Sequence, residues 1–267
     1  MADLTPYHDG RSVTFVNRRR VLLAVGGMAL TGLPRGGPRL WLPPPAAQQA
    51  ASRLRSAPPR PRVLAHADPS YPLDRPLYYI DDAAKSIALT IDDGPDPVYT
   101  PQVLRLLHRY HVTATFSMIG LHVAAYPQLA RAVADAGHQI ANHTWTHADL
   151  VGLPAGRVRS EVARASHAIH AATGVRPGLF RAPYGAWSAA VIAECERMKM
   201  VPVDWSVDPR DWARPGVRRI VSNILHNTRP GSIILEHDGG GNRSQTVAAL
   251  RIVLPRLLDE GYRFQTP

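Results

Sequence analysis

The sequence predicts an α/β fold, a shortened or distorted barrel of parallel strands with its active site at the carboxyl ends of the strands. From about residue 85 onward, short apolar runs alternate with segments of helical periodicity. About seven such runs fit into roughly 180 residues, whereas a full eight-fold barrel takes about 250. The candidate catalytic and metal-binding residues all follow directly after apolar runs. In a barrel of this kind, the active site lies at these positions.

The expected elements follow one another in a regular order. Strands are predicted near residues 86–91, 113–118, 138–142, 178–181, 201–205, 232–236 and 262–265. Helices are predicted near residues 98–110, 124–136, 155–173, 188–198, 217–227 and 245–258. Gly137 and Gly174 end two of these helices and Gly261 follows the last, as glycine commonly does after a helix.

The first eighty residues differ in composition from the rest. Asn17-Arg18-Arg19-Arg20-Val21-Leu22 opens a short apolar stretch, and paired arginines before such a stretch are typical of a twin-arginine export signal. The stretch is too short for a membrane span, so no stable span is expected after cleavage. We predict a signal over residues 1–47, a Pro/Ala/Arg-rich linker over 48–80 and a catalytic domain over 81–267. The alternatives are an uncleaved N-terminal anchor and a different start of the chain.

The formal charge of +10 does not indicate a nucleic-acid partner. Residues 1–80 hold 11 basic against 4 acidic residues, and residues 81–267 hold 20 against 17. The basic excess therefore lies mostly outside the domain expected to fold, and no nucleic-acid-binding motif is present. The single cysteine, Cys195, can form neither an internal disulfide nor a cysteine-based zinc cluster, and we expect it to be a buried small hydrophobe.

Two strings predict a metal site. Asp92 and Asp93 follow the apolar run at 87–91, and His143 and His147 follow the run ending at Asn142. Adjacent carboxylates point in different directions, so one can bind a metal while the other faces water as a base. Two imidazoles and one carboxylate leave coordination positions open, as in catalytic zinc sites. Taken singly, the first string could be an ordinary turn and the second a pair of solvated histidines.

Three further strings follow later strands. Arg181 could orient a carboxylate, Pro183 fixes a turn, and the backbone N–H of Tyr184 could face an oxyanion. Trp212 could wall a sugar pocket, and His237 could be a general acid. The alternatives without a catalytic role are that Arg181 is structural and that Tyr184 and Trp212 pack in the core. The run at 238–241 is expected to be a mobile loop, and it lacks the Gly-Lys-Ser of a phosphate loop.

Five strings in this order resemble the polysaccharide deacetylases, the NodB-homology domain of carbohydrate esterase family 4. They are TIDDGP (90–95), HTWTH (143–147), RAPYG (181–185), DPRDW (208–212) and LEH (235–237). Ile91 replaces a phenylalanine of the family pattern. Glu236 stands where the family commonly has an apolar residue, and strand alternation suggests that it faces away from the chemistry.

The resemblance implies an incomplete, distorted (β/α)7-like barrel with one divalent metal ion, usually zinc. It implies Asp93, His143 and His147 as metal ligands. It also implies these roles: Asp92 as base, Arg181 orienting that base, His237 as acid, Asp211 tuning the acid, and Trp212 and Leu235 lining the acetyl pocket. We further expect the Tyr184 amide to be the oxyanion donor and Pro183 to contact substrate.

These expectations combine into one functional hypothesis. The chain is predicted to be an exported or wall-associated hydrolase that removes acetyl groups from N-acetylated sugars of a polysaccharide through metal-activated water. Peptidoglycan and chitooligosaccharide are the expected substrate types, and protein partners are left open. The alternatives are an O-acetyl (xylan) esterase or a cyclic-amide hydrolase on the same scaffold, and a wall-binding module with a vestigial site.

Overall fold

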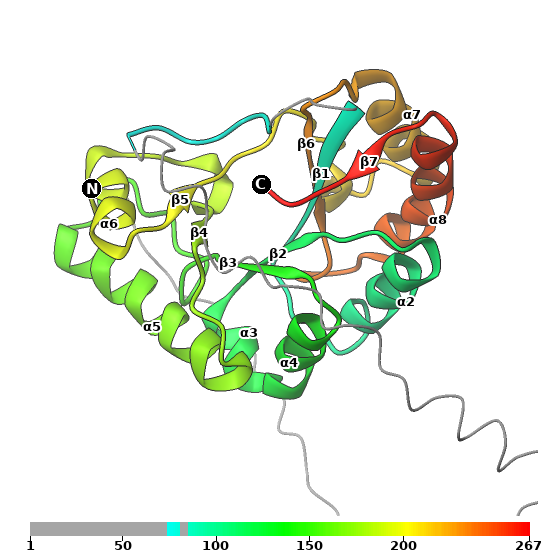
Figure 1. Cartoon of the computed structure of the whole chain (residues 1–267). Helices are drawn as coiled ribbons and strands as arrows, with labels where there is room; N and C mark the ends of the chain where they lie inside the picture. Colours follow the sequence, from blue (N-terminus) through cyan, green and yellow to red (C-terminus); the bar gives the residue numbers. More distant parts are fainter. Residues whose placement is uncertain (1–73, 81–84) are drawn as a thin grey trace, which may run out of the picture. The chain divides into compact units, whose positions relative to one another are not determined.

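The computed structural model describes residues 74–80 and 85–267 of the chain (Figure 1). The predicted export signal and most of the predicted linker therefore lie outside the described residues. Among the described residues, no helix has both the length and the apolar character that crossing a membrane would require.

Seven parallel strands form the predicted α/β barrel, which is incomplete. Their order is β5-β4-β3-β2-β1-β6, and β7 pairs with the start of β1. The strands are β1 (Ser86–Asp92), β2 (Thr115–Met118), β3 (Gln139–Asn142), β4 (Leu179–Phe180), β5 (Val201–Pro202), β6 (Ile233–His237) and β7 (Arg263–Phe264). Every residue of β1 is buried, as expected for a strand covered on both faces.

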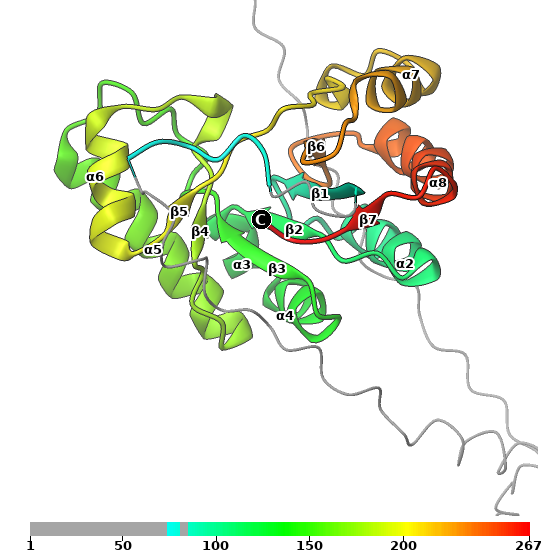
Figure 2. The ribbon, with the colours of Figure 1, turned by 45° about the horizontal axis from the view of Figure 1, so that its top comes forward.

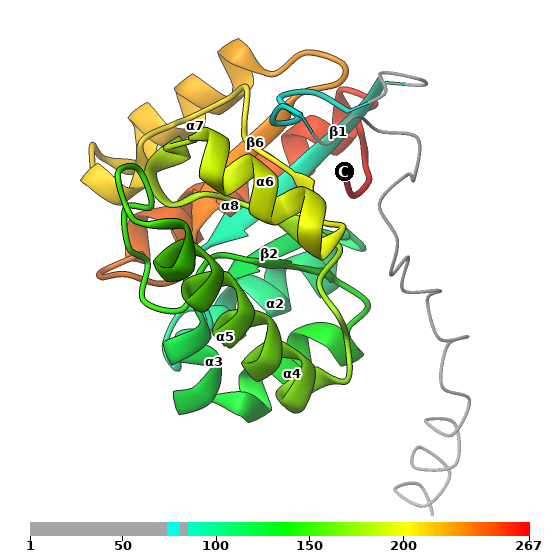
Figure 3. The ribbon, with the colours of Figure 1, turned by 90° about the vertical axis from the view of Figure 1, so that its left-hand side faces the viewer.

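Helices cover the outside of the sheet (Figure 1). They are α2 (Thr100–Tyr110), α3 (Gly120–Ala125), α4 (Pro127–Asp135), α5 (Ala155–Thr173), α6 (Ala189–Met198), α7 (Val217–Asn227) and α8 (Ser244–Asp259). Two short 3-10 helices, η2 (Pro183–Gly185) and η3 (Asp211–Ala213), lie between strands and helices. In Figure 2, α2, α7 and α8 gather on one flank of the sheet and α5 and α6 on the other. Figure 3 shows α5 beside α3, α4 and α6, against which it packs.

The prediction of a single helix at 124–136 is wrong, because the structure contains two helices, α3 and α4, in this region. Tyr126 separates α3 from α4 with a φ of −132° and a ψ of 57°, outside the helical region. Pro127 follows it, and a proline disfavours helical geometry in the residue before it. The first helix also begins earlier than expected, at Gly120, directly after β2.

Residues 77–80 close part of the gap between the two ends of the sheet. The Leu77 N–H donates to the Pro202 carbonyl at 2.8 Å, and the Leu77 carbonyl accepts from the Asp204 N–H at 2.8 Å. The Ile80 N–H donates to the Gly231 carbonyl just before β6. The prediction that the linker extends to residue 80 is therefore corrected, because backbone groups of its last residues pair with both edges of the barrel.

The core lies mainly between the sheet and helices α2, α7 and α8, with a second cluster beneath α5 and α6. Cys195 belongs to this second cluster and is buried, as predicted. Burial raises the pKa of its thiol to about 12, which makes it unreactive near neutral pH.

Candidate active site

The carboxyl ends of the strands bring the predicted site residues together. In the sheet register, Asp92 at the end of β1 lies beside Ser117 of β2 and His237 of β6. His143 directly follows β3 and Arg181 directly follows β4. A cavity of about 340 Å³ opens at this end of the barrel, and its walls are formed by Asp92, Asp93, His143, His147, Ala182, Tyr184, Trp205, Asp208, Trp212, Leu235 and His237.

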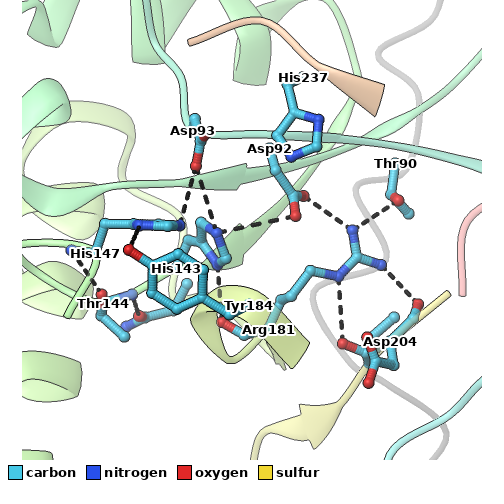
Figure 4. A network of polar contacts seen from close by, with 12 residues as sticks. Thr90, Asp92, Asp93, His143, Thr144, His147, Arg181, Tyr184, Asp204 and His237 are labelled. Atoms are coloured by element: carbon cyan, nitrogen blue, oxygen red, sulfur yellow. Dashed lines mark hydrogen bonds and ion pairs between the residues drawn. The ribbon is translucent and has the colours of Figure 1, made fainter. Parts of the chain in front are cut away.

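Arg181 and Asp92 form a buried ion pair (Figure 4). Nη1 of Arg181 donates to Asp92 Oδ1 at 2.9 Å and to Thr90 Oγ1 at 2.7 Å, while Nη2 donates to the Asp204 carbonyl at 2.7 Å. Burial alone would raise the pKa of Asp92. The charges of Arg181, His143 and His237 instead hold this pKa below its usual value, so Asp92 is ionised at neutral pH.

Asp93, His143 and His147 place three ligand atoms within 4.8 Å of one another. Asp93 Oδ1 lies 3.6 Å from His143 Nε2 and 3.3 Å from His147 Nε2. Two ligands about 2.1 Å from a tetrahedral zinc ion would lie about 3.4 Å apart, so this spacing suits one shared ion. Asp93 Oδ1 is also buried and receives no hydrogen bond from the described residues.

The tautomer of His143 leaves Nε2, the nitrogen that faces Asp93, free to bind a metal ion. Its Nδ1 lies 2.9 Å from the Arg181 carbonyl, which can only accept, so Nδ1 carries the hydrogen and Nε2 presents a lone pair. The Nδ1 of His147 faces the Tyr184 hydroxyl at 3.2 Å. Burial and the neighbouring His143 lower the pKa of His147 despite the charge of Asp93, which favours the neutral imidazole that metals bind. Lone pairs that converge in this way fit a cation.

Side chains outside the cavity hold the loop that carries the two histidines. Glu161 of α5 accepts hydrogen bonds from the backbone N–H groups of Trp145 and Thr146 at 3.0 and 2.8 Å. Asn142 Oδ1 accepts from the Thr144 N–H, and Thr144 Oγ1 accepts from the His147 N–H. These hydrogen bonds hold the backbone of the loop and thereby fix the positions of both imidazoles.

His237 and Asp211 form a second buried pair on the other side of Asp92. His237 Nδ1 lies 2.7 Å from Asp211 Oδ1, and the His237 N–H donates to Asp211 Oδ2 at 2.9 Å. The Thr246 hydroxyl donates to the same Oδ2 at 2.6 Å. Burial opposes the charged imidazole, but the hydrogen bond and charge of Asp211 raise the pKa of His237 to about 9. His237 is consequently protonated at neutral pH and can donate a proton from Nε2.

Aromatic side chains line the mouth of the cavity. Trp212 and Tyr184 are exposed, and Trp205 also contributes to the wall. Leu235 lines the cavity, as predicted from the resemblance. Pro183 is buried in η2 and is not among the residues that line the cavity, and its contact with substrate stays a prediction. Its ring fixes the turn that presents Tyr184, whose backbone N–H has no acceptor among the described residues.

Backbone strain concentrates around the same cavity. Asp93, Thr144, His147 and Tyr184 all have positive φ values, between 61° and 74°, although none is glycine. Such conformations cost about 1–3 kcal/mol each and cluster at functional sites. Here they turn the metal-ligand candidates and the Tyr184 amide toward the cavity.

Arg243 is a site residue that the sequence did not reveal. It is buried, its Nε donates to the Gly239 carbonyl at 2.6 Å and its Nη1 to the Trp212 carbonyl at 3.2 Å. Nη2 lies 3.9 Å from Asp93 Oδ2. Its only signal in the sequence is an arginine after a glycine-rich run and before a helix, a pattern that by itself predicts a mobile loop.

The glycines of that run have a packing role. A Cβ placed at Gly239 would lie 2.1 Å from the Asp93 carbonyl oxygen, and one at Gly240 would lie 2.6 Å from Asp93 Oδ2. Only glycine permits this approach. The loop therefore packs directly on the candidate metal ligand.

Glu236 is a buried acid that lies outside the cavity. Leu235 and His237 line the cavity and Glu236 does not, which agrees with the alternation. On its own face of the strand Glu236 is fully buried, and neither of its carboxyl oxygens has a hydrogen-bond partner among the described residues. Burial and the charge of Asp211 raise the pKa of Glu236 well above its usual value.

The sequence of this chain is similar to those of known deacetylases. Residues 80–203 match the family described as polysaccharide deacetylase. A chitooligosaccharide deacetylase of Bradyrhizobium sp. (strain ANU 289) is 46% identical over 190 residues, which cover 67% of this chain and 87% of that protein. A peptidoglycan-N-acetylglucosamine deacetylase of Bacillus cereus is 45% identical over 184 residues, which cover 68% of this chain and 86% of that protein.

A solved structure has the same fold as this chain. A peptidoglycan N-acetylglucosamine deacetylase in complex with 4-naphthalen-1-yl-N-oxidanyl-benzamide superposes with a TM-score of 0.69 at 32% identity. The match covers 71% of this chain and 89% of that one. The family match, these relatives and the shared fold show that the chain belongs to the polysaccharide deacetylase family, carbohydrate esterase family 4.

Proposed function

We propose that this chain removes acetyl groups from N-acetylated sugars of a polysaccharide of the peptidoglycan or chitooligosaccharide type, with one zinc ion held by Asp93, His143 and His147. The observation that carries the proposal is the convergence of three ligand atoms beside an ionised carboxylate, with a protonated imidazole also lining the cavity. A divalent cation held there would polarise an acetyl carbonyl and lower the pKa of a water molecule.

The residues of the chain supply the proton transfers. Asp92 accepts the proton of the attacking water, since Arg181 engages its Oδ1 and keeps the carboxylate ionised and oriented. The backbone N–H of Tyr184 donates to the oxygen that develops negative charge. His237, held by Asp211 through Nδ1, gives its Nε2 proton to the leaving nitrogen. Trp212 and Leu235 contact the acetylated sugar.

The acid pair favours an N-acetyl substrate over the O-acetyl alternative. An amine is a poor leaving group unless it is protonated, whereas an alkoxide of a sugar ester needs less assistance. A histidine held protonated by a buried carboxylate is the group that an amide requires. The cyclic-amide alternative shares that requirement, and the polymer-acting relatives favour the linear sugar amide. All the expected polar groups are present, which disfavours a vestigial wall-binding module.

Acetate release tests the proposal. The purified protein is incubated with N-acetylated chitooligosaccharide, peptidoglycan, acetylated xylan and a cyclic amide, before and after exhaustive chelation and after addition of zinc. We expect acetate from the first two substrates, its loss on chelation and its return with zinc. Asp93→Ala should lose bound metal, while Asp92→Asn should keep it and lose turnover. Activity that survives chelation would overturn the proposal.

We also propose that the protein is exported by the twin-arginine route and acts at the cell wall. Cleavage near Ala47 would retain residues 77–80, which pair with both edges of the barrel. The test is N-terminal sequencing of the exported protein, together with a variant in which Arg18 and Arg19 are lysines. Export that is unaffected in this variant would exclude the twin-arginine route.

A further inference from the structure

Residues 210–219, beside the cavity, are rich in arginines that the proposed mechanism does not use. We call these residues the arginine strip: Arg210, Arg214, Arg218 and Arg219. All four are exposed, and none of them forms an ion pair with a carboxylate in residues 74–80 or 85–267. The acid within the same ten residues, Asp211, is buried. Since residues 81–267 hold 20 basic against 17 acidic residues, the strip is a local excess of positive charge in a nearly balanced domain.

The strip begins at the mouth of the cavity. The Arg210 guanidinium lies over the ring of Trp212, 5.1 Å from its centroid, and Trp212 lines the cavity. Between Arg214 and α7, the Gly216 N–H donates to Gln245 Oε1 at 2.8 Å, in the first turn of α8. Because α8 follows the glycine-rich run that packs on the candidate metal ligand, the strip lies at the same end of the barrel as the cavity.

The backbone of the strip indicates that the arginine side chains are needed. Arg210 and Arg214 flank η3, and both have left-handed backbone, with φ values of 57° and 55°. Glycine adopts this conformation without the steric cost that a Cβ brings. The same segment does have glycine at another position of positive φ, Gly216. Arginine at two strained positions beside a cavity is consistent with a binding role for the side chain.

The chemistry of the strip fits carboxylates. A guanidinium presents a planar fork of donors that matches a carboxylate in a bidentate pair. Asp208, an acid of the cavity wall, accepts from the backbone N–H of Arg210 at 2.7 Å and forms no ion pair with any guanidinium in the described part of the chain. Of the two proposed substrate types, chitooligosaccharide carries no charge, whereas peptidoglycan carries carboxylates on the side chains of alternate sugars.

We propose that the arginine strip binds the carboxylates of a peptidoglycan strand whose N-acetylated sugar occupies the cavity. This inference rests on the proposed deacetylase function and names the substrate class that the site prefers. Arg210 is stacked on the aromatic ring that contacts the acetylated sugar, so it meets the carboxylate of the neighbouring sugar. Arg214 and the two arginines in the first turn of α7 bind carboxylates further along the strand.

The experiment compares one polymer with and without its charges. Acetate release is measured on soluble peptidoglycan fragments, free of attached wall polymers, and on the same fragments after their carboxyl groups have been amidated. We expect kcat/KM to be about tenfold higher on the charged fragments, the combined effect of several weak surface ion pairs. Glutamine at all four strip positions should bring this ratio close to one, mainly by raising KM on the charged fragments. Arg210→Lys, which keeps the charge, should preserve most of the ratio, and raising the ionic strength should lower it in the parent protein.

A matched control removes the same net charge elsewhere. It carries glutamine at four exposed arginines that do not line the cavity: Arg105, Arg109, Arg176 and Arg251. This variant should keep the parent ratio. Equal cleavage of charged and amidated fragments by the parent protein, or an equal loss of preference in the control variant, would overturn the inference.

A binding measurement separates this inference from the proposed function. Asp92→Asn protein, with and without the strip, is co-sedimented with insoluble peptidoglycan before and after amidation. Binding that requires both the strip and the carboxylates supports the inference even if no acetate is released from any substrate, in which case the proposed function alone fails. Binding that is independent of the strip, or that appears only when phosphate-bearing wall polymers are attached, would overturn the inference and leave the proposed function intact.

Discussion

Arg181 and Asp92 are separated by 89 positions in the chain, yet Nη1 of the arginine donates to Oδ1 of the aspartate at 2.9 Å with both side chains almost fully buried. The same guanidinium also binds Thr90 and the Asp204 carbonyl, so it links β1 to the segment that follows β5. The charge of Arg181 and its fork of donors have separable effects, and each can be tested.

Arg181→Lys should keep the charge and lose the fork, while Arg181→Gln should lose the charge. We expect both to lower kcat by about 10²-fold, because the base is no longer oriented. Only Arg181→Gln should move the acid limb of the pH–rate profile upward, since Arg181 is the main group that lowers the pKa of Asp92. Its stability should fall by about 3–5 kcal/mol, measured by urea unfolding. An acid limb that moves equally in both variants would contradict this separation.

His237→Ala should affect amides and activated esters differently. Loss of a positioned general acid costs about 10²–10⁴-fold, so turnover of an N-acetylated sugar should fall by that factor while metal content stays constant. Aryl acetates, whose leaving groups hardly need protonation, should be affected much less. The measurement is kcat on both substrate types. Equal losses would indicate that His237 is structural or supports the metal instead.

Arg243→Lys should weaken metal binding without removing any metal ligand. The lysine keeps a positive charge near Asp93 Oδ2 but cannot hold the Gly239, Gly240 and Trp212 carbonyls together. Loss of an outer partner of a metal ligand typically costs about 10–100-fold in metal affinity. Competition with a chelator measures this, and Arg251→Lys on the exposed face of α8 is the matched control. Unchanged affinity would show that Asp93 is oriented without Arg243.

His138 should make the barrel sensitive to mild acid. It is buried, its Nδ1 accepts the Ala114 N–H at 3.3 Å, and burial lowers its pKa from 6.5 to about 4. The unfolded chain therefore binds a proton first, so stability present above about pH 6.5 is lost as the pH falls toward 4. The loss from this group is at most about 3 kcal/mol.

The measurement is urea unfolding at several pH values between 7 and 4. His138→Gln should show a smaller loss of stability over this range than the parent protein, and His226→Gln on the exposed face of α7 should behave like the parent. Identical pH dependence in the parent and the His138 variant would contradict the assignment.

The strands and most site residues were predictable because their signals are local. The buried run before Asp92 and the helix ended by Gly174 depend on neighbouring residues alone. The break at Tyr126 is local as well, because Pro127 disfavours helical geometry in the residue before it. The roles of Glu161 and Arg243 were not predictable, since each acts on residues far away in sequence. The position of Asp211 beside His237 depends on how η3 approaches β6, which no periodicity encodes.

The central position of β1 determines when the site can form. The strand that carries Asp92 is made early, yet Thr90 donates to the Ile234 carbonyl 144 positions later, and β1 also pairs with β7 near the end of the chain. Contacts this distant in sequence are slow to form, because a long loop must close before they are made. Asp92 consequently reaches its final surroundings only after β6 and β7 have left the ribosome. Active protein can therefore accumulate only after synthesis of the barrel is finished.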